Sequence, residues 1–432
     1  MSKCKTSSKP ATPTQVDVLT LIQTSLLNAI AVGVRMLTLL GINKILAIYV
    51  GPAGYAALGQ FQNAVQIIST LASGAINTGV TKYTAEYQDN ETKQRKVWKT
   101  AGTIALTSSL VLSLFVLILR EWLALWFLGD TQLSTVFVWF AATLAMFVFN
   151  TLLLAILNGK KDIPRYVLAN ISGSALALVV TFFMVVNWGL LGALIALAVY
   201  QSLAFFATLF LCLKTPWFRW RELVGRVSLP VTKNLLKYTV MALTTAATVP
   251  LSHIFIRNHL GQTLGWEAAG YWEAMWRLSG AYLMFASTTL SVYYLPRLSE
   301  LMTGVEIKKE ILSGYKVILP AAALCAIIVY FLRDFVILTL FSQEFKPMAN
   351  LFFWQLIGDV LKIASWLFAF MMLAKSMTKL YIISEIIFAI SFYGLSVLMI
   401  ERNGLQGVTM AHALNYLIYL AFMARVVVRS LP

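Results

Sequence analysis

Long apolar segments separated by short polar ones fill almost the whole chain. Each segment has about 20 or more residues, the length that a helix needs to cross the hydrocarbon core of a bilayer. We therefore predict an all-α integral membrane protein with twelve transmembrane helices. The predicted spans are 18–49, 54–81, 98–119, 133–157, 164–187, 190–213, 235–257, 268–296, 312–332, 348–373, 379–400 and 404–427.

The first apolar segment begins at Val18, behind a polar tail that contains Lys3, Lys5 and Lys9. It is too long for the core of a signal peptide, and no A-x-A-like cleavage site follows it. We expect it to be a retained first helix.

Composition agrees with this membrane class. Of the 432 residues, 59% are hydrophobic and 12% are charged, whereas an ordinary soluble domain has about 25% charged residues. The net charge of +16 raises the question of nucleic acid, but no recognition helix, zinc spacing or RNA-binding signature accompanies it. We predict no nucleic-acid partner.

The basic residues follow the positive-inside rule. With a cytoplasmic N-terminus, 25 of the 34 Lys and Arg residues fall in cytoplasmic segments. Six fall in outer segments, namely Lys44, Arg120, Arg257, Arg333, Lys346 and Arg402. We predict that both termini are cytoplasmic and that the three remaining basic residues lie within the spans.

Short motifs recur at half the chain length. Six matches at offsets of 213 to 216 appear in the same order in both halves. They are 53–55 with 269–271, 120–122 with 333–335, Trp139 with Trp354, Lys160 with Lys375, Tyr166 with Tyr381, and 189–192 with 404–407. Six spans per repeat is an even number, so the two copies enter the membrane in the same direction.

The repeat predicts two parallel six-helix lobes that rock against each other around a central substrate. The predicted parts are a cytoplasmic tail (1–17), an N-lobe (18–213), a basic cytoplasmic linker (214–237) and a C-lobe (238–432). A duplication without alternating access remains the structural alternative.

Three basic residues within the spans, Arg35, Arg277 and Lys362, require an explanation because charge is costly inside a membrane. Together with Lys44 near the outer end of the first span, they predict a cationic cavity that suits a cargo with negatively charged phosphate groups. Arginine can bind phosphate oxygens through two parallel hydrogen bonds, and lysine adds a point charge. For Arg35 the alternative is that its side chain reaches toward the outer interface.

Two of these basic residues, Arg277 and Lys362, have acidic neighbours and could therefore form structural ion pairs instead of a cargo site. Glu273 stands four residues before Arg277, and Asp359 stands three before Lys362, so that each pair shares a helix face. Such pairs can neutralise each other and join helices instead of binding cargo.

Other polar and aromatic residues are candidates for coupling and for sugar contacts. Asp359, Glu273, Glu385 and His412 are candidates for ion pairing or for coupling to a proton or another cation. Trp272 and Trp276 lie beside Arg277 and are candidates for stacking against sugar rings.

No bound cofactor, metal site or disulfide is predicted. Cys4, Cys212 and Cys325 are far apart and have no CxxC or other metal-ligand spacing.

Several motifs resemble the Wzx family of O-antigen and lipid III flippases. The motifs are Gly51-Pro-Ala-Gly54, Gly79 to Tyr83 with Glu86 to Asn90, Ser291 to Pro296, Leu332 to Phe335 and Trp354 to Lys362. The resemblance covers about Leu21 to Val427 and is most specific from Val317 to Glu385, while the tail before Val18 departs from it.

The resemblance implies the fold of the multidrug/oligosaccharidyl-lipid/polysaccharide exporter superfamily, in the inner membrane of a bacterium. It also implies an undecaprenyl-diphosphate-linked glycan as cargo, and a polymerase and a chain-length regulator of the same glycan pathway as partners. Which repeat unit is carried, and which ion or other energy source drives transport, stay open.

Three rival functions fit the sequence less well than this expectation. An ion-coupled drug or solute antiporter of the same superfamily would favour acidic over basic residues in its cavity, and a major-facilitator carrier would have a G-x-x-x-D-R-x-G-R pattern after its second span, which the loop from Lys82 to Lys99 lacks. A membrane polymerase or ligase for lipid-linked glycans needs a long outer loop, and no outer loop here exceeds about 15 residues. No phosphate-cradling loop, HExxH motif or nucleophile elbow is present in the sequence, so we predict a transporter rather than an enzyme.

Overall fold

The computed structural model describes residues 15–301, 303–375 and 377–430, which are helical almost throughout and contain no strand. Lys3, Lys5, Lys9 and Cys4 lie outside the described residues. The longer helices are α1 (Gln15–Tyr49), α2 (Gly51–Ala72), α4 (Glu91–Ile118), α6 (Ser134–Gly159), α7 (Ile163–Leu213), α8 (Leu229–Leu264), α9 (Trp266–Thr289), α11 (Gly304–Phe331), α13 (Phe352–Ala374), α14 (Thr378–Asn403) and α15 (Gln406–Ser430). The shorter helices used below are α3 (Asn77–Glu86), α5 (Arg120–Leu128), α10 (Leu295–Glu300) and α12 (Arg333–Leu340).

The prediction of twelve spans is confirmed, although a search by apolarity alone finds eight in the described residues. The long helix α7 accounts for two spans, because its backbone turns back at Gly189 with φ 53° and ψ −129°. The other three spans, formed by α2, α8 and α9, are less apolar and fall below the threshold for a membrane span. These three polar helices pack against one another.

Several helix boundaries differ from the prediction. The second span is interrupted between α2 and α3, where Gly74 and Ala75 have positive φ values of 61° and 50°. The eighth span passes into a π-helical turn at Leu290–Tyr294 before α10. Helix α8 begins at Leu229, so the last part of the predicted linker is helical.

The internal repeat is present in the backbone as well as in the sequence. Gly189 and Gly404, 215 positions apart, both adopt an unusual conformation with φ values of 53° and 58° and ψ values of −129° and −141°. Gly51 and Gly265, 214 positions apart, also have positive φ values where α2 and α9 begin. The short helices α5 and α12 begin at Arg120 and Arg333, which are equivalent positions in the repeat.

The outer ends of the two halves are packed together into one core. Tyr55 of α2 makes edge-to-face contacts with Phe341 and Phe345, at ring-centroid distances of 6.0 and 5.1 Å. Lys44 of α1 reaches the same place and donates to the carbonyl oxygens of Leu338 and Phe341 at the end of α12, at 2.9 and 2.5 Å. Residues from both halves thus share one hydrophobic cluster at this end.

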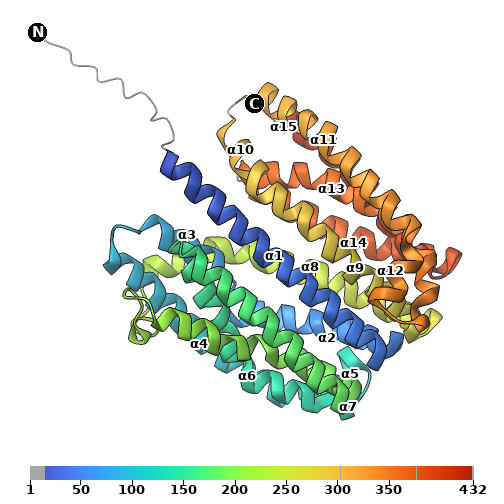
Figure 1. Ribbon diagram of the computed structural model, residues 1–432, viewed down its shortest axis with the longest axis horizontal. Helices are drawn as coiled ribbons and strands as arrows, with labels where there is room; N and C mark the ends of the chain where they lie inside the picture. Colours follow the sequence, from blue (N-terminus) through green and yellow to red (C-terminus); the bar gives the residue numbers. More distant parts are fainter. Residues whose placement is uncertain (1–14, 302, 376, 431–432) are drawn as a thin grey trace, which may run out of the picture.

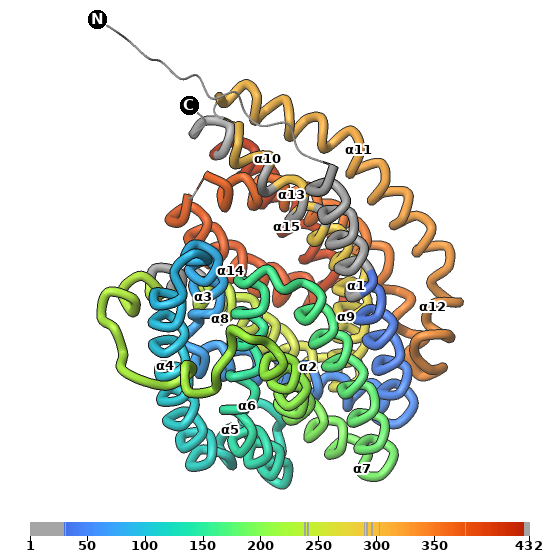
Figure 2. The backbone as a smooth tube through the Cα atoms, turned by 60° about the vertical axis from the view of Figure 1, so that its left-hand side comes forward, coloured from blue at the N-terminus to red at the C-terminus, as the bar shows by residue number. Residues whose placement is uncertain are grey.

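The inner ends have separate cores. One cluster combines residues of α3, α4, α6 and α7 with the connecting segment and the start of α8. A second cluster is built from the π-helical turn at Leu290–Tyr294 and from α10, α11, α13, α14 and α15. Figure 1 shows the two groups of helices diverging toward the end where α3 and α10 lie, and Figure 2 shows them as separate bundles with α1 alongside. The molecule is closed at its outer end and open at its inner end.

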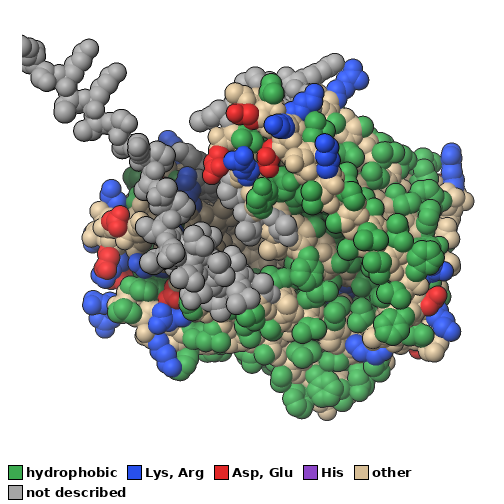
Figure 3. Space-filling view, turned by 45° about the horizontal axis from the view of Figure 1, so that its top comes forward, with side chains coloured by type: hydrophobic (Ala, Val, Ile, Leu, Met, Phe, Trp, Pro, Cys, Tyr) green, Lys and Arg blue, Asp and Glu red, His purple; other side chains and the backbone are tan. Residues whose placement is uncertain are grey.

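The surface matches a protein that lies in a lipid bilayer. Hydrophobic side chains cover most of the middle of the face in Figure 3, while Lys and Arg gather toward its ends. Many large hydrophobic residues of the long helices are exposed, including Leu114 and Ile118 of α4 and Ile387 and Ile390 of α14. In water such a surface would be an aggregation site, but in a bilayer it contacts lipid.

The turns at the outer ends of both repeats generate a testable prediction. A methyl group on Gly192 would lie 1.9 Å from the Met184 carbonyl oxygen, and one on Gly407 would lie 2.1 Å from the Met399 carbonyl oxygen. We expect Gly192→Ala and Gly407→Ala each to destabilise the protein by about 1–3 kcal/mol because the backbone must move. Thermal unfolding of the purified protein in detergent measures this loss. Gly394→Ala has no neighbouring atom within 4 Å and is the control; equal midpoints for all three variants would contradict the close packing.

Candidate functional site

A buried polar network joins the two halves of the molecule near the middle of the bundle. Its centre is Glu273 of α9, which accepts hydrogen bonds from Arg257 of α8 at 2.5 Å and from Arg277 at 2.8 Å. Two glutamines of α2, in the first half, complete it. The Gln60 side-chain oxygen accepts from Arg257 at 2.7 Å, and the Gln62 oxygen accepts from Arg277 at 2.8 Å.

The register of the α8–α9 hairpin explains why these groups meet. Arg257 stands eight residues before Gly265, the turn between the helices, and Glu273 stands eight residues after it. At 1.5 Å per residue both side chains therefore lie at the same depth, roughly 12 Å from the turn. The pair is nearly inaccessible, with side-chain exposures of 1% for Arg257 and 5% for Glu273.

Arg257 corrects one assignment made from the sequence. It was counted among the outer-loop cations because the seventh span was ended at residue 257, but α8 continues to Leu264 and buries it. The internal repeat contained the information needed to place the end of the seventh span correctly. Tyr49 and Gly51 at the end of the first span correspond to the Gly265 region, which places the end of the seventh span near residue 264.

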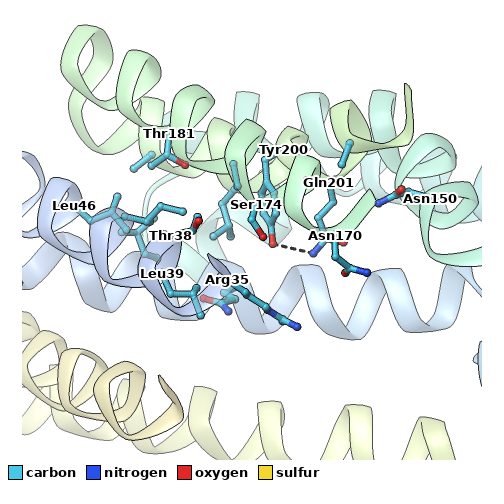
Figure 4. Close-up of a pocket in the computed structure, with 18 of the residues that line it drawn as sticks. Arg35, Thr38, Leu39, Leu46, Asn150, Asn170, Ser174, Thr181, Tyr200 and Gln201 are labelled. Carbon is cyan, nitrogen blue, oxygen red and sulfur yellow. Dashed lines mark hydrogen bonds between the residues drawn. The ribbon is translucent and has the colours of Figure 1, made fainter. Parts of the chain in front are cut away.

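A cavity of about 240 Å³ lies inside the first half, between α1, α2, α6 and α7, and Arg277 of α9 also lines it. Figure 4 shows Arg35 extending from α1 into this space, opposite Asn170, Ser174, Tyr200 and Gln201 of α7. Apart from the two guanidinium groups, its polar lining is mostly amides and hydroxyls. We refer to it as the first cavity.

The structure brings two of the predicted cationic residues together. Arg35 and Arg277 line the first cavity, although they come from different halves of the chain. Arg35 is exposed and makes no hydrogen bond or ion pair with any described residue. Arg277 is held by Glu273 and Gln62 but remains partly accessible, with a side-chain exposure of 15%.

Lys44 is placed differently from the prediction. It does not line either of the cavities within the two halves. Its ammonium group is bonded to the last carbonyl groups of α12, where a cation also interacts favourably with the helix dipole. Lys44 therefore stabilises the closed outer end.

A second cavity, of about 380 Å³, lies inside the second half between α8, α9, α13, α14 and α15. Lys362, Glu385 and Trp276 all line it. The Lys362 ammonium nitrogen lies 4.6 Å from the ring centre of Trp276 and 5.5 Å from that of Tyr416. The surroundings of this cation are thus aromatic.

The two cavities occupy equivalent places in the repeat. Ten pairs of lining residues are separated by the same offset of 215 positions. They are Thr38 and His253, Leu154 and Ala369, Ala169 and Ser384, Asn170 and Glu385, Gly173 and Phe388, Ser174 and Ala389, Ala177 and Phe392, Tyr200 and Asn415, Gln201 and Tyr416, and Ala204 and Tyr419. Duplication therefore produced two cavities, whose chemistry then diverged.

The structural alternative of a direct ion pair between Asp359 and Lys362 is not found among the described residues. Asp359 instead contacts His412 of α15 at 3.0 Å and accepts hydrogen bonds from Ser279 at 2.6 Å and from Tyr282 of α9. No carboxylate of the described residues lies within 4 Å of the Lys362 ammonium group. Residues three apart share a helix face, but the Asp359 carboxylate bonds to side chains of other helices instead.

The two tryptophan candidates are in different environments. Trp272 is fully buried and packs against His253 and the guanidinium group of Arg257, so it cannot contact a sugar. Trp276, one helical turn further along α9, is partly exposed and lines the second cavity.

No metal centre is found among the described residues, since no group of three or more His, Cys, Asp or Glu side chains is placed to hold an ion. Cys212 and Cys325 are free thiols.

Known structures share this architecture. An inward-facing multidrug transporter of the MATE family superimposes with a TM-score of 0.76 at 15% identity, covering 92% of this chain and 95% of the transporter. The lipid II flippase MurJ in an inward closed conformation gives a TM-score of 0.72 at 13% identity, covering 94% of this chain and 87% of MurJ. These likenesses establish the fold of the MOP superfamily.

Sequence comparison adds the family. The lipid III flippase of Escherichia coli strain K12 is 30% identical over 401 residues, which cover 93% of this chain and 96% of that protein. The lipid III flippase of Shigella flexneri matches to the same extent. Residues 21–302 match the family described as polysaccharide biosynthesis protein. The chain belongs to this polysaccharide biosynthesis protein family, as a multi-pass membrane transporter with the MOP-superfamily fold.

Proposed function

We propose that this chain is a flippase that carries a polyprenyl-diphosphate-linked oligosaccharide from the cytoplasmic to the outer leaflet of the bacterial inner membrane. The observation that carries the proposal is the first cavity, in which Arg35 and Arg277 from the two halves face one space. The lipid III flippases that resemble the chain over most of its length support the same cargo class.

The charges of the first cavity suit a diphosphate. Arg257 and Arg277 share one carboxylate, Glu273, so this group has a net charge of +1. Arg35 adds another positive charge without an acidic partner. A diphosphate between a lipid and a sugar has one negative charge on each phosphate, and guanidinium groups bind such oxygens in a bidentate manner.

The closed outer end and the open inner end suit the loading step. A cargo lipid enters from the cytoplasmic leaflet, where the two bundles diverge, and the aromatic contacts of Tyr55 with Phe341 and Phe345 close the opposite end. Alternating access then requires these outer contacts to separate while the inner ends come together. The polar contacts of Gln60 and Gln62 lie between the halves, near the level where such rocking moves atoms least.

The rival functions fit the site less well. A drug or cation antiporter would need a cavity with surplus negative charge, whereas the first cavity has surplus positive charge. A lipid-glycan polymerase or ligase would need a reactive nucleophile or a metal, and the lining of the first cavity consists of arginine, amide, hydroxyl and apolar side chains. A polymerase and a chain-length regulator of the same glycan pathway remain proposed partners.

The two arginines that share Glu273 allow a matched test of the cargo site. Arg35→Ala and Arg277→Ala should reduce rescue of a strain that lacks its own flippase for a lipid-linked repeat, by tenfold or more at equal membrane expression, because each removes a phosphate ligand at the cost of about 1.5–3 kcal/mol. Surface exposure of the glycan measures rescue.

Arg257→Ala is the structural control. It leaves the first cavity intact but breaks a buried pair, so we expect a lower yield of folded protein, consistent with a loss of about 3–5 kcal/mol. Full rescue by both Arg35→Ala and Arg277→Ala would leave the flippase assignment standing but exclude these residues as cargo ligands.

Coupling to a proton or another cation stays a prediction, and the geometry separates its candidates. The Asp359 carboxylate is occupied by donors from α9, α13 and α15, including His412. Glu385 lines the second cavity and makes no hydrogen bond or ion pair with a described residue. We propose Glu385 as the coupling residue if transport uses a cation gradient.

The coupling test compares two isosteric variants. Glu385→Gln should transport slowly and become insensitive to an uncoupler that collapses the proton gradient, because its side chain can no longer bind a cation. Asp359→Asn should stay as sensitive as the wild type. Accumulation of flipped lipid in inverted vesicles measures both. Loss of sensitivity in Asp359→Asn alone would move the coupling role to that residue, and an insensitive wild type would exclude proton coupling.

A further inference from the structure

The second cavity has no role in the binding of a diphosphate by Arg35 and Arg277. It is the repeat equivalent of the first cavity, yet four of its equivalent positions have become aromatic, while Tyr200 of the first cavity corresponds to Asn415. Small or amide residues of the first cavity are replaced by aromatic rings at the equivalent positions of the second. The replacements are Phe388 for Gly173, Phe392 for Ala177, Tyr416 for Gln201 and Tyr419 for Ala204.

Several polar groups also line the second cavity, and two of them lack strong partners. Lys362 lies over the rings of Trp276 and Tyr416 without an acid in salt-bridge distance. Asn415 of α15 is 5% exposed, and its side-chain oxygen is buried without a hydrogen-bond partner. An unpaired buried amide oxygen costs about 1–3 kcal/mol, so a ligand that donates a hydrogen bond to Asn415 would recover stability.

Helix α9 connects the two cavities at adjacent residues. Arg277 lines the first cavity, and Trp276, the residue before it, lines the second. Successive residues of a helix point about 100° apart, so α9 presents one side chain to each cavity at the same depth. A cargo whose diphosphate is bound at Arg277 therefore lies against the same turn of α9 that presents Trp276 to the second cavity.

We propose that the second cavity is a glycan subsite, in which a sugar ring of the cargo replaces the Lys362 ammonium group over the Trp276 ring while its hydroxyl edge bonds to Asn415 and Lys362. A sugar ring has an apolar C–H face and a polar edge, and the cavity offers aromatic faces together with a few fixed polar groups. Its volume of about 380 Å³ lies within the range of about 300–1,000 Å³ that is typical of small-molecule sites. This inference rests on the proposed flippase function and assigns its glycan end.

The division of labour has a physical reason. The diphosphate is common to all polyprenyl-linked cargo and needs positive charge, which the first cavity supplies through Arg35 and Arg277. The glycan differs from cargo to cargo, so its recognition depends on stacking and on hydrogen bonds to buried polar groups. The second cavity would thus determine which glycan is accepted.

The test measures binding to the purified full-length chain in lipid nanodiscs with two probes. One is undecaprenyl diphosphate without sugar, and the other is the lipid-linked oligosaccharide extracted from a flippase-deficient strain that the wild-type chain rescues. Trp276→Leu removes the stacking face, and Ala389→Leu fills the second cavity from α14 without removing a polar group. Two controls bracket these variants: Ser174→Leu, at the position equivalent to Ala389 in the first cavity, and Trp139→Leu, which replaces a tryptophan exposed on the lipid-facing surface.

We expect Trp276→Leu and Ala389→Leu each to bind the glycolipid about tenfold more weakly than wild type while binding the bare lipid with the wild-type affinity. Ser174→Leu should weaken both probes, and Trp139→Leu neither. Unchanged glycolipid affinity in both variants, or an equal loss for both probes, would overturn the glycan subsite in favour of another occupant such as a lipid chain or a cation. Failure of the wild type to rescue any strain would instead overturn the flippase function itself.

Discussion

The bond of one carboxylate to two guanidinium groups is the constraint on which the rest of this structure depends. Glu273 holds Arg257 and Arg277 in the middle of a membrane protein, where unpaired charges would be very costly. Because the pair must be desolvated together, α8 and α9 are fixed in register about the turn at Gly265. The same guanidinium groups bond to Gln60 and Gln62 and so tie this hairpin to α2 of the other half.

That network explains why three of the twelve spans are not apolar enough to be recognised by hydropathy. Helices α2, α8 and α9 face one another across the boundary between the halves and carry the polar groups of the network there. Helices such as α4 and α14 face the lipid over most of their surface, and their backbone hydrogen bonds are satisfied within the helix. Their side chains can therefore be apolar. Polarity is concentrated where the two halves meet, which is also where a charged cargo must be received.

Duplication gave both halves the same framework and left their chemistry free to diverge. The turns at Gly189 and Gly404 have the same conformation, and the cavities behind them are lined by equivalent positions. At one of these positions Asn170 in the first half corresponds to Glu385 in the second. A framework of equivalent helices can therefore support a cationic, amide-rich cavity on one side and an aromatic one on the other, without a change of fold.

The sequence by itself determined the helical class, the number of spans, the repeat and the presence of Arg35, Arg277 and Lys362 within the membrane, because these follow from segment length, hydrophobicity and spacing along one chain. It could not decide partners between helices. Spacing alone left open a pair between Asp359 and Lys362, three residues away, but the Asp359 carboxylate is bound by His412 and Ser279 from other helices. The burial of Arg257, the capping role of Lys44 and the full enclosure of Trp272 were likewise decided by tertiary packing. Spacing along a helix determines which side chains lie on the same face of that helix. Only the packing of segments distant in the sequence determines which residues of other helices contact that face.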